Sequence, residues 1–200
     1  MANLLILSRV ALVFLLSLGI GGFFIYSLES RRELESRAMA TQIASSHAKS
    51  LEKQLSHSLS ATLALATILK EDSSFPNFDR VAADLIERYG GISNLQLAPN
   101  AVISKIFPLK GNELAVGLDL KKNQRAVAAI EAKELTVEGP FNLMQGGISV
   151  VGRYPVFLKE NKVGEEKFWG FTTALIELAP LLALVDIHGL VAKNYHFKLF

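Results

Sequence analysis

The residues best suited to binding a ligand lie between positions 138 and 153, where glycines alternate with polar side chains. Glu138 precedes the segment GPFNLMQGG at 139–147, and Arg153 follows within an otherwise apolar run. Glycines let a backbone approach a ligand closely, and an arginine can present a two-pronged donor to an anionic or carbonyl group. A structural turn beside a solvent-facing Arg153 is the alternative. We predict a ligand-binding site formed by Arg153, Asn142, Gln145 and Gly147, with Glu138 beside them.

Signatures of catalysis and of metal binding are missing from the sequence. It contains no nucleophile elbow, P-loop, H-E-x-x-H motif or EF-hand loop, and it has no cysteine. His47 and His57 are ten residues apart on a predicted helix, whereas metal-binding pairs on one helix are spaced four apart. We therefore expect solvated histidines and a non-enzymatic region with no metal and no cofactor.

Composition narrows the class of protein further. The 200 residues carry 21 basic and 19 acidic side chains, and half of them are hydrophobic. Such a chain is too apolar for a disordered tail, and its net charge of +2 is too small for a nucleic-acid-binding module. The lack of cysteine leaves the compartment open.

Residues 10–28 form an uncharged apolar run of 19 residues. As a helix, the run would be roughly 28 Å long, close to the hydrocarbon thickness of about 30 Å. A cleaved signal peptide has a shorter apolar core and ends in small residues, whereas Glu29 and Arg31 follow this run. We predict a transmembrane signal-anchor at 10–28 behind a cytoplasmic tail at 1–9, with a buried core helix as the alternative. The arginines flanking the run leave its orientation open.

Residues 29–71 contain neither glycine nor proline, which predicts one long stalk helix. Along it, apolar or small side chains are spaced alternately by four and three, a period of 3.5 that keeps one stripe facing a partner helix. The stripe can mediate a parallel homodimer or pack on the chain's own domain, along different stretches. Its members are Ala44, Ala48, Leu51, Leu55, Ser58, Thr62, Leu65 and Leu69.

The remainder predicts an α+β domain with an antiparallel sheet. Asn77 is expected to cap a helix at 78–89 that Gly90 and Gly91 end, followed by a hairpin of strands at 92–97 and 102–107. A helix at 122–132, strands at 135–138, 148–158 and 168–175, and a last helix at 179–187 complete the order. Trp169 is expected in the core.

Five segments resemble the CHASE family of extracytoplasmic sensor domains, found in bacterial membrane receptors and plant cytokinin receptors. They are GISNLQLAPNAVISKIFP at 91–108, residues 111–120, EGPFNLMQGG at 138–147, GRYPVF at 152–157 and FWGF at 168–171. The segments occur in the family's order over about residues 75–187. The ligand-anchoring carboxylate of the cytokinin receptors has no match around Lys105–Leu109, which argues against cytokinin itself.

The resemblance implies a PAS-like antiparallel sheet with flanking helices and a bound small molecule, in a periplasmic domain anchored in the bacterial inner membrane. Residues 75–200 would form a C-terminally truncated sensor domain. Dimer rearrangement through residues 44–69 would pass the ligand state to a cytoplasmic output domain. One alternative is that the intact protein is itself a GGDEF or EAL enzyme of c-di-GMP metabolism or a histidine kinase of a two-component system. A membrane-anchored dimerisation module without ligand is the alternative from a different class.

Overall fold

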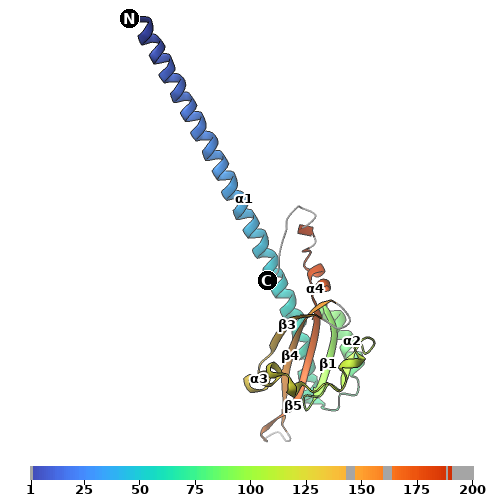
Figure 1. Ribbon diagram of the computed structural model, residues 1–200. Coiled ribbons are helices and arrows are strands. Elements are labelled where there is room, and N and C mark those ends of the chain that lie inside the picture. The colour runs from blue at the N-terminus through green and yellow to red at the C-terminus, as the bar shows by residue number, and fades with distance from the viewer. Residues whose placement is uncertain (1, 143–146, 160–163, 188, 191–200) are drawn as a thin grey trace. The chain divides into compact units, whose positions relative to one another are not determined.

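The computed structural model describes residues 2–142, 147–159, 164–187 and 189–190, without the side chains of 2–11 and 13. The chain divides into two units, residues 1–48 and 49–200. Helix α1 (Ala2–Glu71) runs through the first unit and ends within the second (Figure 1). The long helix predicted to reach residue 71 is therefore confirmed.

The first unit is helical throughout its described residues. Its large apolar side chains from Leu12 to Leu28 are 56–71% exposed. An ion pair one turn apart, Arg37 Nη2 to Glu33 Oε1 at 2.6 Å, lies on the same helix. In the part of the chain that the structure describes, no helix combines the length and hydropathy needed to cross a membrane. The helix predicted at 10–28 is thus present, and its role as a membrane span is not confirmed.

The second unit is built on an antiparallel five-stranded sheet with the strand order β2-β1-β5-β4-β3. This confirms the predicted α+β class. The long central strands β4 and β5 pair along most of their length, so that residues far apart in sequence share one surface. The strands are β1 (Ile92–Pro99), β2 (Lys105–Phe107), β3 (Thr136–Asn142), β4 (Ile148–Lys159) and β5 (Glu166–Glu177).

Three helices and two 3₁₀ turns connect the strands near their predicted positions. The helices are α2 (Phe78–Tyr89), α3 (Gln124–Ala132) and α4 (Leu178–Leu184), and the 3₁₀ turns are η1 (Glu113–Ala115) and η2 (Leu120–Lys122). The predicted hairpin turn is present, with Asn100 and Ala101 at φ values of +53° and +65°. The second strand is shorter than predicted because Val102 bridges to Asp119 instead.

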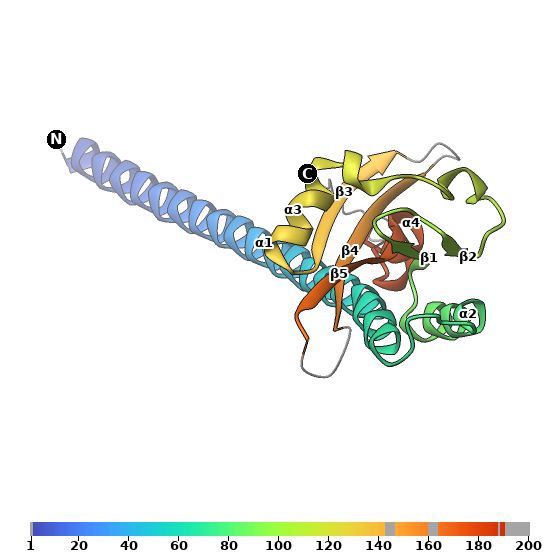
Figure 2. The same ribbon diagram turned by 90° about the horizontal axis from the view of Figure 1, so that it is seen from below.

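One face of the sheet is covered by α2 and by the end of α1 (Figure 2). Leu59, Leu65 and Leu69 of α1 are at most 4% exposed in the core cluster on this face. Gly152 on β4 permits the close approach, because a Cβ atom there would collide with Leu59 Cδ2. The Thr172 hydroxyl of β5 also donates a 2.8 Å hydrogen bond to the Thr62 carbonyl of α1. This face is therefore apolar and closely packed.

Of the two roles predicted for the stripe on α1, its C-terminal part takes the second, packing on the chain's own domain. Ser58, Thr62, Leu65 and Leu69 are 0–1% exposed, and the surfaces that bury them belong to their own chain. The small side chain of Ser58 fits against the end of α2, where its hydroxyl donates a 2.7 Å hydrogen bond to the Gly90 carbonyl. These four residues are therefore buried within their own domain, whereas Ala44 and Ala48 are exposed, and the homodimer stays a prediction.

The opposite face of the sheet lies under α3 and the segment between β2 and α3 (Figure 2). A second, smaller apolar cluster covers part of it, and polar side chains occupy much of the rest. The apolar cluster consists of Ala98, Ala101, Ile103, Ile106, Leu120, Ala126, Ala129 and Phe171.

Helix capping differs from the sequence prediction. Asn77 precedes α2 but its side chain makes no capping hydrogen bond, so the predicted cap is wrong. Its backbone dihedrals (φ −97°, ψ 26°) lie outside the extended region from which an N-cap side chain reaches back to the helix. The side-chain cap instead occurs at α3, where Asn123 Oδ1 accepts from the backbone amides of Arg125 and Ala126 at 2.9 and 3.4 Å.

Candidate functional site

A row of polar side chains crosses four adjacent strands on the α3 face of the sheet. Gln96 of β1 is the register partner of Thr173 of β5, which is in turn the partner of Arg153 of β4. Thr136 of β3 continues the row opposite Arg153. Cross-strand partners have Cβ atoms about 4.5–5.5 Å apart and project to the same side. The polar row, Gln96-Thr173-Arg153-Thr136, is therefore a continuous surface.

The period of the strands places the row on this face. Gly152 and Thr172 contact α1 on the first face, so the next residue of each strand, Arg153 or Thr173, faces the other way. Arg153 is 6% exposed, Thr173 1% and Gln96 7%. These three members of the row are thus buried, whereas Thr136 is half-buried.

Arg153 is paired with Glu138 of β3 within the site. Arg153 Nη1 donates to Glu138 Oε1 at 2.6 Å, and the two side chains are 7% and 4% exposed. Glu138 lies where the β3–β4 register shifts, next to Gly139, whose φ is +129°. A Cβ at Gly139 would lie 2.9 Å from the Ser149 carbonyl oxygen, so this turn of the strand requires glycine.

Two opposing effects act on the pKa of Arg153. Burial lowers the pKa of the Arg153 guanidinium below its ordinary value, while the charge of Glu138 and the hydrogen bond to it act in the opposite direction. A buried ion pair is tolerated when its charges are matched and hydrogen-bonded. Arg153 and Glu138 together therefore add no net charge to the interior.

Glu138 also connects the site to α3. Its second oxygen, Oε2, accepts a long 3.4 Å hydrogen bond from Asn123 Nδ2, and the other side-chain atom of Asn123 caps the helix. One carboxylate thereby joins β3, β4 and the start of α3. A change in the partners of Glu138 would be felt at the first turn of this helix.

A second polar chain extends the site beyond β1. Gln96 Nε2 donates to Asn94 Oδ1 at 2.8 Å, and Asn94 Nδ2 donates to Asn112 Oδ1 at 3.1 Å. Asn112 in turn donates to the Pro108 carbonyl at 2.9 Å. These bonds tie the segment that follows β2 to the polar face of the sheet.

Two donors in the middle of the polar row lack a hydrogen-bond partner. In the described part of the chain, Arg153 Nε and Thr173 Oγ1 are buried and unpaired, as is Ser149 Oγ further along β4. Leaving such a group unsatisfied costs about 1–3 kcal/mol, and native structures rarely do so. Arg153 Nε and Thr173 Oγ1 are directly cross-strand and could both donate to one ligand atom.

The structure brings together two of the five site residues predicted from sequence, Arg153 and Glu138. Asn142 is exposed and pairs with Ile148 at the end of β3. Gly147 has a φ of +88° and open space around its Cβ position, which is typical of a turn. Gln145 lies outside the described residues. The ligand-binding role of these residues remains a prediction.

Sequence reasoning missed Thr173, Gln96 and Asn94. The signal was present, because polar Asn94 and Gln96 alternate with Leu95 and Leu97 in one strand. Such alternation ordinarily indicates a strand with one face in water. Here α3 and the segment before it cover that face, so that the polar residues become an interior site.

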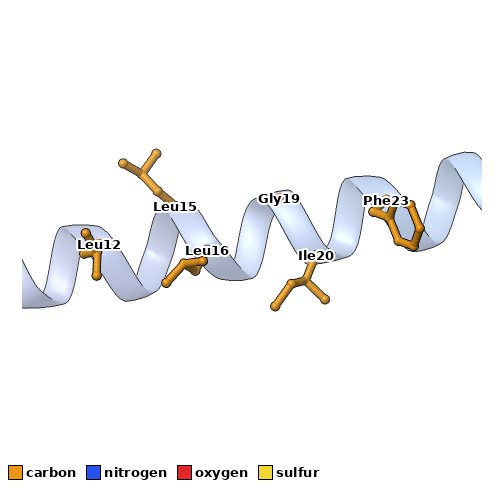
Figure 3. Close-up of a pocket in the computed structure, with 6 residues that line it drawn as sticks. All are labelled: Leu12, Leu15, Leu16, Gly19, Ile20 and Phe23. Atoms are coloured by element: carbon orange, nitrogen blue, oxygen red, sulfur yellow. The ribbon is translucent and has the colours of Figure 1, made fainter.

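Several hollows lie away from the polar row, and they include the following three. A hollow of about 520 Å³ on α1 is lined by apolar residues around Gly19, including Leu16 and Phe23 (Figure 3). It offers no polar side chain that could orient a small molecule. A cleft of about 590 Å³ lies by α2 and β2, and another of about 410 Å³ includes Trp169. Trp169 is half-buried and packs against the core, in agreement with prediction.

Metal ligation has no support in the described residues. No three histidine or acidic side chains gather there in a way that could hold a metal ion.

Comparison with known proteins identifies both family and fold. The sequence profile of the CHASE domain matches residues 24–200. No curated protein matches the chain. The extracellular ligand-binding receptor of Desulfohalobium retbaense has a similar structure, with a TM-score of 0.59 and 13% identity over 73% of this chain and 26% of that chain.

Two chemoreceptor domains have the same fold. The ligand-binding domain of an amino acid chemoreceptor of Pseudomonas aeruginosa, in complex with GABA, has a TM-score of 0.52 and 17% identity over 70% of this chain and 63% of its own. That of a Campylobacter jejuni chemoreceptor, in complex with 4-methylisoleucine, has a TM-score of 0.50 and 13% identity over 69% and 57%. This chain therefore spans between a quarter and two thirds of these relatives.

Proposed function

Because the chain belongs to the CHASE domain family, we propose that it is the ligand-sensing input region of a membrane receptor and has no catalytic activity of its own. The observation that carries the proposal is the pair of buried, unpartnered donors on Arg153 and Thr173. They lie in a polar row that strands from four places in the sequence assemble. A small molecule bound there would complete their hydrogen bonds.

The chemistry of the relatives' ligands supports a small polar ligand. The P. aeruginosa chemoreceptor domain binds GABA and the C. jejuni domain binds 4-methylisoleucine. Both molecules are compact and carry groups that an arginine and a hydroxyl can recognise. We propose a ligand of comparable size for the polar row of this chain.

Membrane anchoring through residues 10–28 is part of the proposal. Its support is the uncharged run in the sequence and the exposure of large apolar side chains along that part of α1. The sensor domain would lie in the periplasm of a bacterium. An alkaline phosphatase fused after Glu71 should be active in cells, and an inactive fusion would overturn this orientation.

Transmission would proceed through the sheet to α1. Arg153 and Thr173 face the proposed ligand, while their neighbours Gly152 and Thr172 contact α1 on the opposite face. A ligand that shifts β4 against β5 would therefore displace this helix, provided that it binds two conformations with different affinity. A homodimer through the exposed part of the stalk, around Ala44 and Ala48, would carry the change to an output domain. A c-di-GMP enzyme or a histidine kinase would fill that role.

Thermal unfolding of the full chain in mild detergent, against a panel of metabolites, tests the sensing function. At least one compound should raise the Tm of the wild type and of the Arg125→Ala control, an exposed arginine on α3. The same compound should not stabilise the double variant Arg153→Leu/Glu138→Leu, in which no buried charge is left unpaired. If no compound acts, the result favours a membrane-anchored dimerisation module without ligand.

A further inference from the structure

We propose that Glu138 is the specificity determinant of the polar row and restricts it to ligands of zero net charge that present a hydrogen-bond acceptor. The inference rests on the proposed ligand-sensing function and names the class of ligand. Of the two groups that the sequence predicts for recognition by Arg153, anionic or carbonyl, it retains only the uncharged one.

The charge balance of the site disfavours an anionic ligand. Arg153 is matched by Glu138 at 2.6 Å, and both side chains are more than nine-tenths buried. A monoanion entering beside them would leave one uncompensated negative charge in the interior, where a lone charge is strongly unfavourable. A neutral amide, a neutral heterocycle or a zwitterion leaves the balance at zero.

The free donors of the polar row favour a ligand that presents a hydrogen-bond acceptor. Arg153 Nη1 is taken by Glu138, whereas Arg153 Nε and the Thr173 hydroxyl have no partner among the described residues. Because Arg153 and Thr173 are register partners, their donors can converge on one oxygen or ring nitrogen. Such an atom completes both hydrogen bonds without disturbing the ion pair.

Glu138 is suited to act as a fixed counter-ion. Its position is set by Gly139, where the strand bends, and by Asn123, which is itself held as the cap of α3. An anion that displaced Glu138 from Arg153 would leave the carboxylate buried with only the 3.4 Å bond to Asn123. Exclusion of anions is therefore built into the strand and helix that hold Glu138.

The test compares a matched pair of probes, acetamide and acetate, at constant ionic strength. The readout is the ¹⁵N–¹H signal of Arg153 Nε in the full chain, assigned by its loss in the Arg153→Leu/Glu138→Leu variant. In the wild type and in a Glu131→Gln control, an exposed glutamate on α3, acetamide should shift the signal and acetate should not. In Glu138→Gln the preference should reverse, with acetate binding tighter by about tenfold or more.

Several outcomes would overturn the proposal. Acetate shifting the wild-type signal as strongly as acetamide would do so, as would no shift from either probe, or a Glu138→Gln protein without gain for acetate. If Glu138→Gln does not fold, the wild-type comparison decides alone. Failure of the sensing function is distinguishable: screen hits that are all anions would refute the charge rule alone, whereas acetate binding by Glu138→Gln without any screen hit would refute the sensing function alone.

Discussion

The two faces of the sheet are both covered, yet they are built from opposite chemistry. On the α1 face, leucines and alanines close over Gly152, and Thr172 finds its partner on the helix. On the α3 face, an ion pair, a row of amides and two unpaired donors lie beneath the covering segments. One face therefore stabilises the fold through apolar packing, while the other retains buried donors that have no hydrogen-bond partner.

The polar face should give the largest effect when its charges are unbalanced. Glu138→Leu leaves the Arg153 charge buried alone and should lower the free energy of unfolding by about 3–5 kcal/mol. Adding Arg153→Leu should recover most of the loss, because an apolar pair carries no desolvation penalty. Chemical denaturation of the full chain in detergent measures both. A double variant as unstable as the single one would show that the pair itself stabilises the face.

The apolar face should respond as a closely packed core. Leu65→Ala on α1 removes a side chain that is 0% exposed and should lower the free energy of unfolding by about 3 kcal/mol. Leu63→Ala, two residues earlier and 42% exposed, should cost about 0.5 kcal/mol or less. Equal losses in urea denaturation would mean that α1 does not bury one face preferentially.

Neighbouring threonines on β5 compare the two faces directly. Thr172→Val removes the hydrogen bond to Thr62 and should lower the free energy of unfolding by about 1 kcal/mol. Thr173→Val removes an unpaired hydroxyl and should be neutral or stabilise by up to about 1 kcal/mol. The reverse order in denaturation midpoints would contradict the assignment of free donors to the α3 face.

A similarly small effect is expected at the helix starts that flank the sheet. Asn123→Ala removes the side-chain cap of α3 and should lower the free energy of unfolding by about 1 kcal/mol. Asn77→Ala at α2 removes no capping bond and should change little. Thermal unfolding of the two variants side by side provides the measurement, and equal shifts in Tm would indicate that Asn77 caps its helix in solution.

Local patterns in the sequence predicted most of the fold. The absence of breakers predicted α1 to its last residue, and short extended runs between turns and helices predicted the strands to within a few positions. These features depend on neighbours along the chain. The partner of the stripe on α1 was less determined, because Ser58 and Thr62 suit either a second helix or a sheet. Their burial against the chain's own sheet follows from Gly152, ninety residues further on.

The site was only partly predictable for the same reason. Arg153 was conspicuous because a charge interrupts an apolar strand, and Glu138 because it precedes a glycine-rich segment. Thr173 and Gln96 carry no such local mark, since threonine and glutamine are common on exposed strands. Their importance arises from register, which places them beside Arg153, and from the segments that cover them.

Gly152 provides a test of the proposed transmission from the sheet to α1. A methyl group at this position would push β4 and α1 apart, because its Cβ would meet the end of the Leu59 side chain. The added methyl group would displace the helix without touching Arg153, which faces the other way. Gly152→Ala would thus mimic the movement that a ligand is proposed to cause. Adding Leu59→Ala to the same chain would remove the side chain that obstructs the methyl group. Substitutions at position 152 thereby test the proposed movement of α1 separately from ligand binding at Arg153.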